Sequence, residues 1–250
     1  MNVASRRRPE VGLITADPTP TLLGLLSVLG IDSIVVDAEQ TGVTAADCAG
    51  VVQRLRGSGV RVGVRVPSVD GDCLLTFANT GVDELVLPRL RSPDPLETAY
   101  RATRFPPLGE RPRQVSPASG YGTSYEHAPV LSVLFETVEA LDRLADFIGH
   151  PRFQGGWVGP TDLADDLRRA GRGDELSDAT QRIVDAVADA GHSIGLPAPS
   201  AARAHEVHAR GADRSAIYWE REIGAVLREL VGARRESASS SGYNDAPSSE

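Results

Sequence analysis

The sequence predicts an α/β protein folded as a single (β/α)8 TIM barrel, and three observations support this class. Short apolar runs rich in β-branched residues alternate with helical segments along the chain, as in parallel βαβ units. A glycine repeatedly separates a helix from the next apolar run. The length of 250 residues suits one barrel. An open doubly wound sheet is the alternative, and the absence of a Gly-x-Gly-x-x-Gly motif after any run counts against it.

Eight strands are expected, each a continuous apolar run of the kind that parallel strands buried on both faces show. In chain order they are residues 11–14, 33–36, 61–64, 84–87, 130–135, 156–158, 193–196 and 215–217. The glycines expected to end helices in a left-handed conformation before a strand are Gly30, Gly59, Gly81, Gly191 and Gly211. Together these signals predict a closed sheet of parallel strands.

Helices are expected between the strands, and most begin at Pro, Ser or Thr, which favour helix starts. They include residues 18–29, 44–56, 93–104, 138–147, 177–190 and 200–210. The connection 105–128 is rich in Pro, Gly and Ser, and a loop of this length is typically functional or mobile. It could extend over one end of the barrel or onto a neighbouring molecule.

The folded domain is predicted to span residues 11–233. The segments 1–10 and 234–250 are polar with little apolar content, so we expect both to be disordered tails. The formal net charge of −8 argues against a nucleic-acid partner. No apolar run has the length of a membrane span or of a secretory signal, so we expect a cytoplasmic protein without a membrane partner.

Two carboxylates follow neighbouring predicted strands. Glu136 comes directly after the strand at 130–135, and the motif Gly159-Pro160-Thr161-Asp162 follows the strand at 156–158. A β/α barrel carries its chemistry at these carboxyl ends of strands. Two carboxylates completed by water suit an octahedral hard cation such as Mg²⁺ or Mn²⁺ better than zinc. Alternatively, Glu136 starts the next helix and Asp162 caps one.

Arg65 ends another predicted strand. A guanidinium at the end of a buried strand must meet an anion there, either a substrate or a structural partner such as Asp37 or Glu39. The free N–H groups where Gly159, Pro160 and Thr161 open a helix could also bind a carboxylate or a phosphate, although helix capping explains them almost as well.

Taken in this order, these groups resemble the HpcH/HpaI family of class II pyruvate aldolases, whose type members cleave 4-hydroxy-2-oxoheptane-1,7-dioate. The resemblance covers roughly residues 11–230. The matching stretches are residues 30–39, 64–67, 80–88, 105–111, 135–137 and 159–163. The last two, at the correct spacing, are the most specific.

The resemblance implies a (β/α)8 barrel that assembles as a homo-oligomer, a hexamer or a trimer. It also implies a divalent metal cation held by Glu136 and Asp162, which chelates the carboxylate and keto oxygens of a small 2-oxo acid such as pyruvate. Arg65 would then stabilise the enolate that forms when the carbon–carbon bond breaks. A dication and a guanidinium both oppose a developing oxyanion, so these roles are physically consistent.

The sequence departs from the family pattern where proton transfer is expected. The family has a His after Glu39 and an Asp before the fourth strand, and here these positions hold Gln40 and Asn79. Both replacements keep hydrogen bonding and lose titratable function, so Gln40 cannot act as a base near neutral pH. The alternatives for the base are Glu39, His127 and a metal-bound water.

Arg89 is a second departure, because the family usually has an apolar residue after the proline of the fourth strand. A cation there could bind a second anionic group of the substrate, or it could pair with an acidic neighbour.

We therefore predict a metal-dependent carbon–carbon lyase that acts on a 2-oxo acid through a pyruvate-type enolate, in the cleaving or the synthetic direction. One alternative keeps the enolate and changes the reaction, to decarboxylation, tautomerisation or a specialised condensation. Another is a non-catalytic ligand-binding protein. The presence of Glu136, Asp162 and Arg65 argues against the last alternative.

Overall fold

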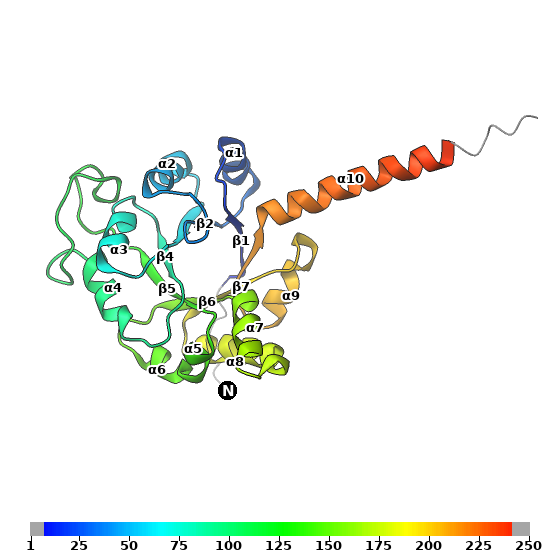
Figure 1. Cartoon of the computed structure of the whole chain (residues 1–250). Helices are drawn as coiled ribbons and strands as arrows, with labels where there is room; N and C mark the ends of the chain where they lie inside the picture. Colours follow the sequence, from blue (N-terminus) through cyan, green and yellow to red (C-terminus); the bar gives the residue numbers. More distant parts are fainter. Residues whose placement is uncertain (1–7, 242–250) are drawn as a thin grey trace, which may run out of the picture.

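The computed structural model of the chain describes residues 8–241, and these form a closed barrel of eight parallel strands (Figure 1). Each strand pairs with the next one in sequence, and β8 closes the barrel against β1. The predicted (β/α)8 class is therefore confirmed. The strands are β1 (Glu10–Thr15), β2 (Ser33–Asp37), β3 (Arg61–Arg65), β4 (Glu84–Leu87), β5 (Val130–Phe135), β6 (Gly155–Val158), β7 (Ser193–Pro197) and β8 (Arg214–Tyr218).

Helices surround the barrel and connect its strands (Figure 1). They are α1 (Pro20–Leu29), α2 (Ala45–Leu55), α3 (Gly71–Ala78), α4 (Pro95–Thr103), α5 (Val138–Asp142), α6 (Leu144–Gly149), α7 (Pro160–Arg169), α8 (Leu176–Asp189), α9 (Ala204–Ala209) and α10 (Trp219–Ser241), with short 3-10 helices η1 (Pro117–Ser119), η2 (Gly173–Glu175) and η3 (Ala201–Arg203). The single helix predicted at 138–147 is two helices, because the backbone at Arg143 leaves the helical conformation with φ −103° and ψ 21°.

The predicted tails differ from the structure at their inner ends. Strand β1 begins at Glu10, and α10 continues as a helix to Ser241, so residues 234–241 are helical instead of an unstructured tail. Residues 1–7 and 242–250, which make up most of both predicted tails, lie outside the described residues.

The glycines expected before the strands adopt the predicted conformation. Gly30, Gly59, Gly81, Gly191 and Gly211 have φ between 74° and 97°. This region is costly for any residue with a Cβ atom, so glycine ends these helices cleanly and turns the chain into the next strand.

A buried ion pair lies inside the amino-terminal end of the barrel. Arg214, the first residue of β8, donates from Nη1 to Oε1 of Glu84, the first residue of β4, over 2.7 Å. The same carboxylate oxygen accepts a hydrogen bond of 3.1 Å from the indole Nε1 of Trp157 on β6, and the guanidinium carbon of Arg214 lies 4.5 Å from the Trp157 ring centroid. The ion pair therefore holds the indole in place from the amino-terminal side.

The long connection is anchored at this amino-terminal end of the barrel. The side chain of Arg111 is fully buried, and its Nε and Nη2 atoms donate to Asn79 Oδ1 over 3.1 Å and to Ala78 O over 2.9 Å. The guanidinium carbon lies 4.3 Å from the centroid of the Phe105 ring. Burial lowers the pKa of Arg111 to about 10, and the nearby charge of Arg104 lowers it too. The anchored part of the connection thus lies at the end of the barrel opposite to the carboxyl ends of the strands.

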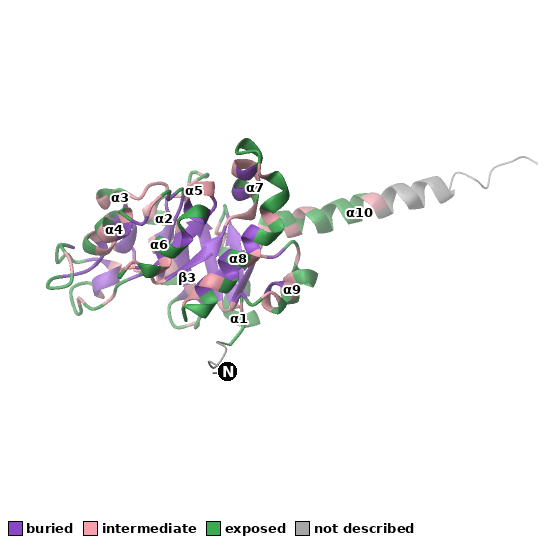
Figure 2. Cartoon of the chain, turned by 90° about the horizontal axis from the view of Figure 1, so that it is seen from below, coloured by how far each residue is buried: buried purple, intermediate pink, exposed green. Residues whose placement is uncertain are grey.

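Helix α10 extends away from the barrel instead of packing along it (Figures 1 and 2). Its start is fixed by Glu220, whose Oε1 accepts a hydrogen bond of 2.6 Å from Thr15 Oγ1 at the end of β1. Beyond this point, large apolar side chains are exposed at helical spacing; they are Ile223, Val226, Leu227, Leu230 and Val231. Leu25, Val28 and Leu29 on α1 are also exposed. The single chain thus leaves two apolar surfaces uncovered.

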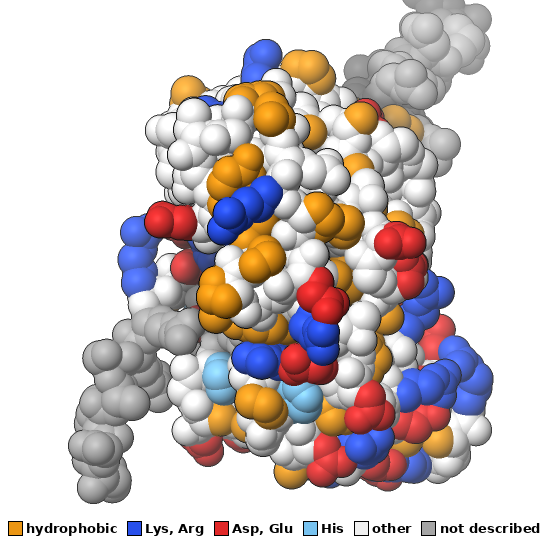
Figure 3. Space-filling view, turned by 90° about the vertical axis from the view of Figure 1, so that its left-hand side faces the viewer, with side chains coloured by type: hydrophobic (Ala, Val, Ile, Leu, Met, Phe, Trp, Pro, Cys, Tyr) orange, Lys and Arg blue, Asp and Glu red, His pale blue; other side chains and the backbone are white. Residues whose placement is uncertain are grey.

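Charged side chains on the outer surface are mixed in sign. On the face shown in Figure 3, basic and acidic groups lie beside one another, and pairs such as Arg152 with Glu97 and Arg172 with Asp142 illustrate this mixing. Among the described residues, no helix combines the length and the apolar character needed to cross a membrane.

Replacing Glu84 by Gln should lower the free energy of unfolding by roughly 3–5 kcal/mol, because it leaves the buried charge of Arg214 without its partner. Urea unfolding followed by circular dichroism measures this loss. The double variant Glu84→Gln with Arg214→Met should recover much of it, since no buried charge then remains unpaired. A Glu84→Gln variant as stable as the unmodified chain would show that the pair does not support the barrel.

Candidate active site

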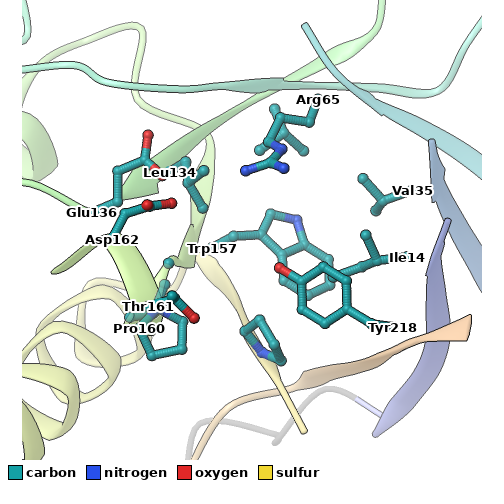
Figure 4. Close-up of a pocket in the computed structure, with 14 residues that line it drawn as sticks. Ile14, Val35, Arg65, Leu134, Glu136, Trp157, Pro160, Thr161, Asp162 and Tyr218 are labelled. Carbon is teal, nitrogen blue, oxygen red and sulfur yellow. The ribbon is translucent and has the colours of Figure 1, made fainter. Parts of the chain in front are cut away.

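A pocket opens at the carboxyl ends of the strands (Figure 4). Its polar lining comes from Arg65, Glu136, Thr161, Asp162 and Tyr218. Its apolar lining includes Ile14, Val35, Val86, Leu134 and Trp157, which belong to a separate small cluster inside the barrel. The structure thus brings Glu136, Asp162 and Arg65, which were expected to hold the metal and the enolate, to one pocket.

Glu136 lies between β5 and α5 and caps neither. Thr137 is the N-cap of α5, and its side chain accepts a hydrogen bond from Ala140 N, which leaves the Glu136 carboxylate free to face the pocket. The carboxylate accepts a hydrogen bond of 2.6 Å from Arg89 N at Oε1. A Cβ atom at Gly159 would lie 2.9 Å from Glu136 Cβ, so glycine permits this close approach. The alternative that Glu136 starts the helix is therefore not what the structure shows.

Burial raises the pKa of Glu136 from its ordinary value of 4.5 to about 7. The Arg89 N–H lowers the pKa, while the negative charges of Glu39 and Asp162 raise it further. A carboxylate in this position is thus poorly compensated by the protein itself, and a bound cation would favour its ionised form.

Asp162 lies in the first turn of α7, whose N-cap is Gly159. Its carboxylate accepts no hydrogen bond from any residue in the described part of the chain, so it does not cap the helix. Glu136 and Asp162 lie side by side at one wall of the pocket in Figure 4. Both carboxylates therefore keep oxygen atoms available for a ligand.

Arg65 is held by two carboxylates at the end of β3. Its Nε and Nη2 atoms donate to the two oxygens of Asp37 over 3.0 and 2.6 Å, and its Nη1 lies 3.1 Å from Glu39 Oε2. That Glu39 oxygen is buried and accepts no hydrogen bond, so the contact with Arg65 is between charges only. Burial alone would lower the pKa of Arg65, but the hydrogen bond to Asp37 and the charges of Asp37 and Glu39 raise it overall. The predicted structural ion pair is present, and the same guanidinium faces the pocket.

Arg89 pairs with an acidic neighbour. Its Nε lies 3.0 Å from Glu39 Oε1, and its Nη2 donates to Pro67 O over 2.8 Å. Its backbone has φ 56°, in the left-handed region that non-glycine residues rarely adopt. Arg89 does not line the pocket, so its observed contribution is the backbone N–H that it donates to Glu136.

The structure does not bring Asn79 or His127 to this pocket. Asn79 ends α3 and His127 Nε2 lies 2.9 Å from Val82 O, so both are at the amino-terminal end of β4. Gln40 follows β2 at the carboxyl end, where its side chain is exposed. Within one chain Gln40 and Asn79 therefore lie at opposite ends of the barrel, because one follows a parallel strand and the other precedes one.

Tyr218 and Trp157 line the pocket, and the sequence did not indicate either of them as a site residue. The predicted eighth strand ended at Ile217, one residue before the tyrosine, so its position at a strand end went unassigned. The aromatic residue directly after an apolar run was the available signal. Burial raises the pKa of the Tyr218 hydroxyl, while the charge of Arg65 lowers it.

The two carboxylates fit a hard divalent cation. No cluster of three or more His, Cys, Asp or Glu side chains suited to a metal occurs within residues 8–241, so the protein would supply only Glu136 and Asp162. An oxygen-only set of two carboxylates, with substrate and water completing the coordination, suits Mg²⁺ or Mn²⁺. The raised pKa of Glu136 is consistent with a site that is electrostatically incomplete without a cation.

Residues 11–218 match the protein family described as HpcH/HpaI aldolase/citrate lyase. The chain belongs to this family. A curated relative is the 5-keto-4-deoxy-D-glucarate aldolase of Shigella dysenteriae serotype 1 (strain Sd197), 26% identical over 220 residues that cover 84% of this chain and 86% of that protein. The match confirms the HpcH/HpaI family that the sequence motifs indicated.

Solved structures show the same fold at lower identity. A HpcH/HpaI aldolase/citrate lyase family protein from Burkholderia cenocepacia J2315 superimposes with a TM-score of 0.81 at 23% identity, covering 92% of this chain and 95% of its own. Macrophomate synthase superimposes with a TM-score of 0.79 at 18% identity, covering 93% of this chain and 86% of its own. These likenesses establish the fold.

A divalent cation should raise the melting temperature more at pH 8 than at pH 5. The unfolded chain loses the Glu136 proton near its ordinary pKa of 4.5 and the folded chain near 7, so without a cation stability falls as the pH rises between these values. Binding to the ionised carboxylates offsets this loss. Thermal unfolding with and without Mn²⁺ at both pH values measures the difference.

The variant Glu136→Gln should lose this stabilisation by Mn²⁺. Glu139→Gln, which changes an exposed carboxylate on α5 that pairs with Arg91, is the matched control and should keep it. An equal response of both variants to Mn²⁺ would contradict a metal site at Glu136.

Proposed function

We propose that this protein is a divalent-metal-dependent carbon–carbon lyase that acts on a small 2-oxo acid through a pyruvate-type enolate. The observation that carries the proposal is the shared pocket of Glu136, Asp162 and Arg65 at the carboxyl ends of the barrel strands. Membership of an aldolase/citrate lyase family supports a lyase-type enzyme. The proposal includes a specific likeness, within this family, to the 4-hydroxy-2-oxoheptane-1,7-dioate aldolases.

Arg65 is the group of this chain that would stabilise the enolate oxygen. Its side chain is only 13% exposed, and ion pairs with Asp37 and Glu39 hold it in place. A positive charge fixed before the reaction does not have to reorganise as the oxyanion develops, and it acts strongly where little water is present. A cation at Glu136 and Asp162 would supply Lewis-acid polarisation of the keto oxygen.

The second part of the proposal concerns which reaction the enolate undergoes. The exposed Gln40 supplies no titratable base, so cleavage of simple 4-hydroxy-2-oxo acids should be slow. Enolate chemistry other than aldol cleavage, such as decarboxylation, tautomerisation or condensation, is the alternative, and macrophomate synthase shares this fold. A purely ligand-binding role is disfavoured, because Glu136, Asp162 and Arg65, the side chains proposed to hold the metal and the enolate, are all present.

Replacing Arg65 by Lys should slow Mg²⁺-dependent exchange of the pyruvate methyl protons in D₂O by about 10²-fold or more, since one oxyanion donor is typically worth that much. Proton NMR of pyruvate follows the exchange. Arg61→Lys is the matched control, because Arg61 begins the same strand β3 and pairs with Glu10 at the opposite end. No exchange in the unmodified protein would overturn the proposed function, and full exchange in Arg65→Lys would assign Arg65 a structural role only.

A homo-oligomer, either a hexamer or a trimer, is the third part of the proposal. An apolar stripe, made of Ile223, Val226, Leu227, Leu230 and Val231, is exposed along α10, and Leu230 is 64% exposed. Val28 on α1 is 75% exposed. Apolar surfaces of this kind are typically covered by association.

The double variant Leu227→Glu with Leu230→Glu should therefore lower the mass measured by light scattering on a sizing column. The single variant Arg228→Glu changes the charge by the same amount on the same helix and keeps the stripe, so it should retain the assembly. The same mass in both variants would show that the α10 stripe does not join subunits.

A further inference from the structure

Tyr218 is the last residue of β8 and pairs with Ile14 of β1 in the closed barrel. Figure 4 shows its ring entering the pocket across from Glu136 and Asp162, with the hydroxyl directed toward the space between these carboxylates and Arg65. The phenol also lies within electrostatic range of Arg65, Asp37, Asp162 and Glu136, all of which act on its pKa. The hydroxyl is therefore part of the same charged site.

The Tyr218 hydroxyl forms no hydrogen bond with any other residue that the structure describes. Of the carboxylates near the pocket, Asp37 and Glu39 hold Arg65 and Glu136 accepts the Arg89 N–H. Asp162 is the second carboxylate of the proposed metal site. The pocket lining contains no histidine among the described residues. Its other hydroxyl belongs to Thr161, and an aliphatic hydroxyl is a much weaker acid than a phenol.

The position of the Tyr218 hydroxyl suits the end of a 2-oxo acid that carries its carbon chain, away from the carboxylate and keto oxygens. The proposed function places the oxygens of such an acid at the Glu136 and Asp162 wall and near Arg65. The carbon chain must then face the rest of the lining. Once Glu136, Asp162 and Arg65 are set aside, Tyr218 is the only titratable group among the described lining residues. Because burial raises the pKa of Tyr218, its hydroxyl keeps its proton near neutral pH and can act as a donor.

We propose that Tyr218 is the catalytic residue that donates a proton to the enolate carbon, an inference that rests on the proposed function. The electron pair of the enolate double bond takes the phenolic proton, so a C–H bond forms and the O–H bond breaks. The electron pair of the O–H bond remains on the phenolate oxygen, near the positive charge of Arg65. The phenolate then takes a proton from water, which releases hydroxide to the solvent and restores the hydroxyl. The reverse sequence removes a proton from the methyl group of pyruvate.

The test uses the full chain with Mg²⁺ and pyruvate in D₂O. Tyr218→Phe keeps the ring and removes the hydroxyl, so methyl proton exchange should fall by about 10²-fold or more, the usual effect of losing a positioned proton donor. The dissociation constant for oxalate, measured by titration calorimetry with Mg²⁺, should stay within about threefold of the value for the unmodified protein. Binding of oxalate involves no transfer of the Tyr218 proton. Tyr121→Phe is the matched control: its hydroxyl bonds to Gln53 on α2, outside the pocket.

Three results would overturn the inference, and they are distinguishable. Exchange in Tyr218→Phe within about threefold of the unmodified protein would remove Tyr218 from proton transfer while leaving the proposed function intact. Loss of oxalate binding in the same variant would assign the hydroxyl to substrate binding instead. Absence of exchange in the unmodified protein would overturn the proposed function and the Tyr218 assignment together.

Discussion

The arrangement of the site depends on the way Arg65 is held between Asp37 and Glu39. Several carboxylates converge on one end of the barrel, and like charges in a partly buried place repel one another. Arg65 compensates Asp37 and Glu39, and Arg89 adds a second positive charge on Glu39. Glu136 accepts a backbone N–H from Arg89, and no cationic side chain among the described residues forms an ion pair with Glu136 or Asp162.

A second ion pair separates this site from the other end of the barrel. Glu84 and Arg214 lie buried at the amino-terminal ends of β4 and β8, and both contact Trp157, which lines the pocket from β6. Gly195 leaves room for the indole, because a Cβ atom at this position would lie 2.2 Å from the ring. The pocket thus has an apolar floor that is fixed by polar groups beneath it, and such a floor limits the access of water to the charges above.

Under the proposed function, this chain carries the groups that would stabilise an enolate, while two positions expected to serve proton transfer hold Gln40 and Asn79. Glu136, Asp162 and Arg65 share one pocket, while the exposed Gln40 supplies hydrogen bonding only. Tyr218 brings a hydroxyl to the opposite wall of the same pocket. A barrel tolerates such exchanges because each strand end carries its own side chain and the scaffold below does not depend on it.

The sequence by itself determined the barrel, because glycine signals and continuous apolar runs are local features that repeat along the chain, and all eight predicted strands occur in the structure. It also indicated Glu136, Asp162 and Arg65, since a charged residue that ends an apolar run reveals its place on a strand. Only the tertiary structure decided which of these groups meet. Asn79 and His127 are separated from the pocket by the length of the strands, and Tyr218 reaches it from β8, more than fifty positions beyond Asp162 in the sequence. Which residues share a pocket depends on how the barrel closes and on which end each loop occupies, and neither is encoded in a local pattern.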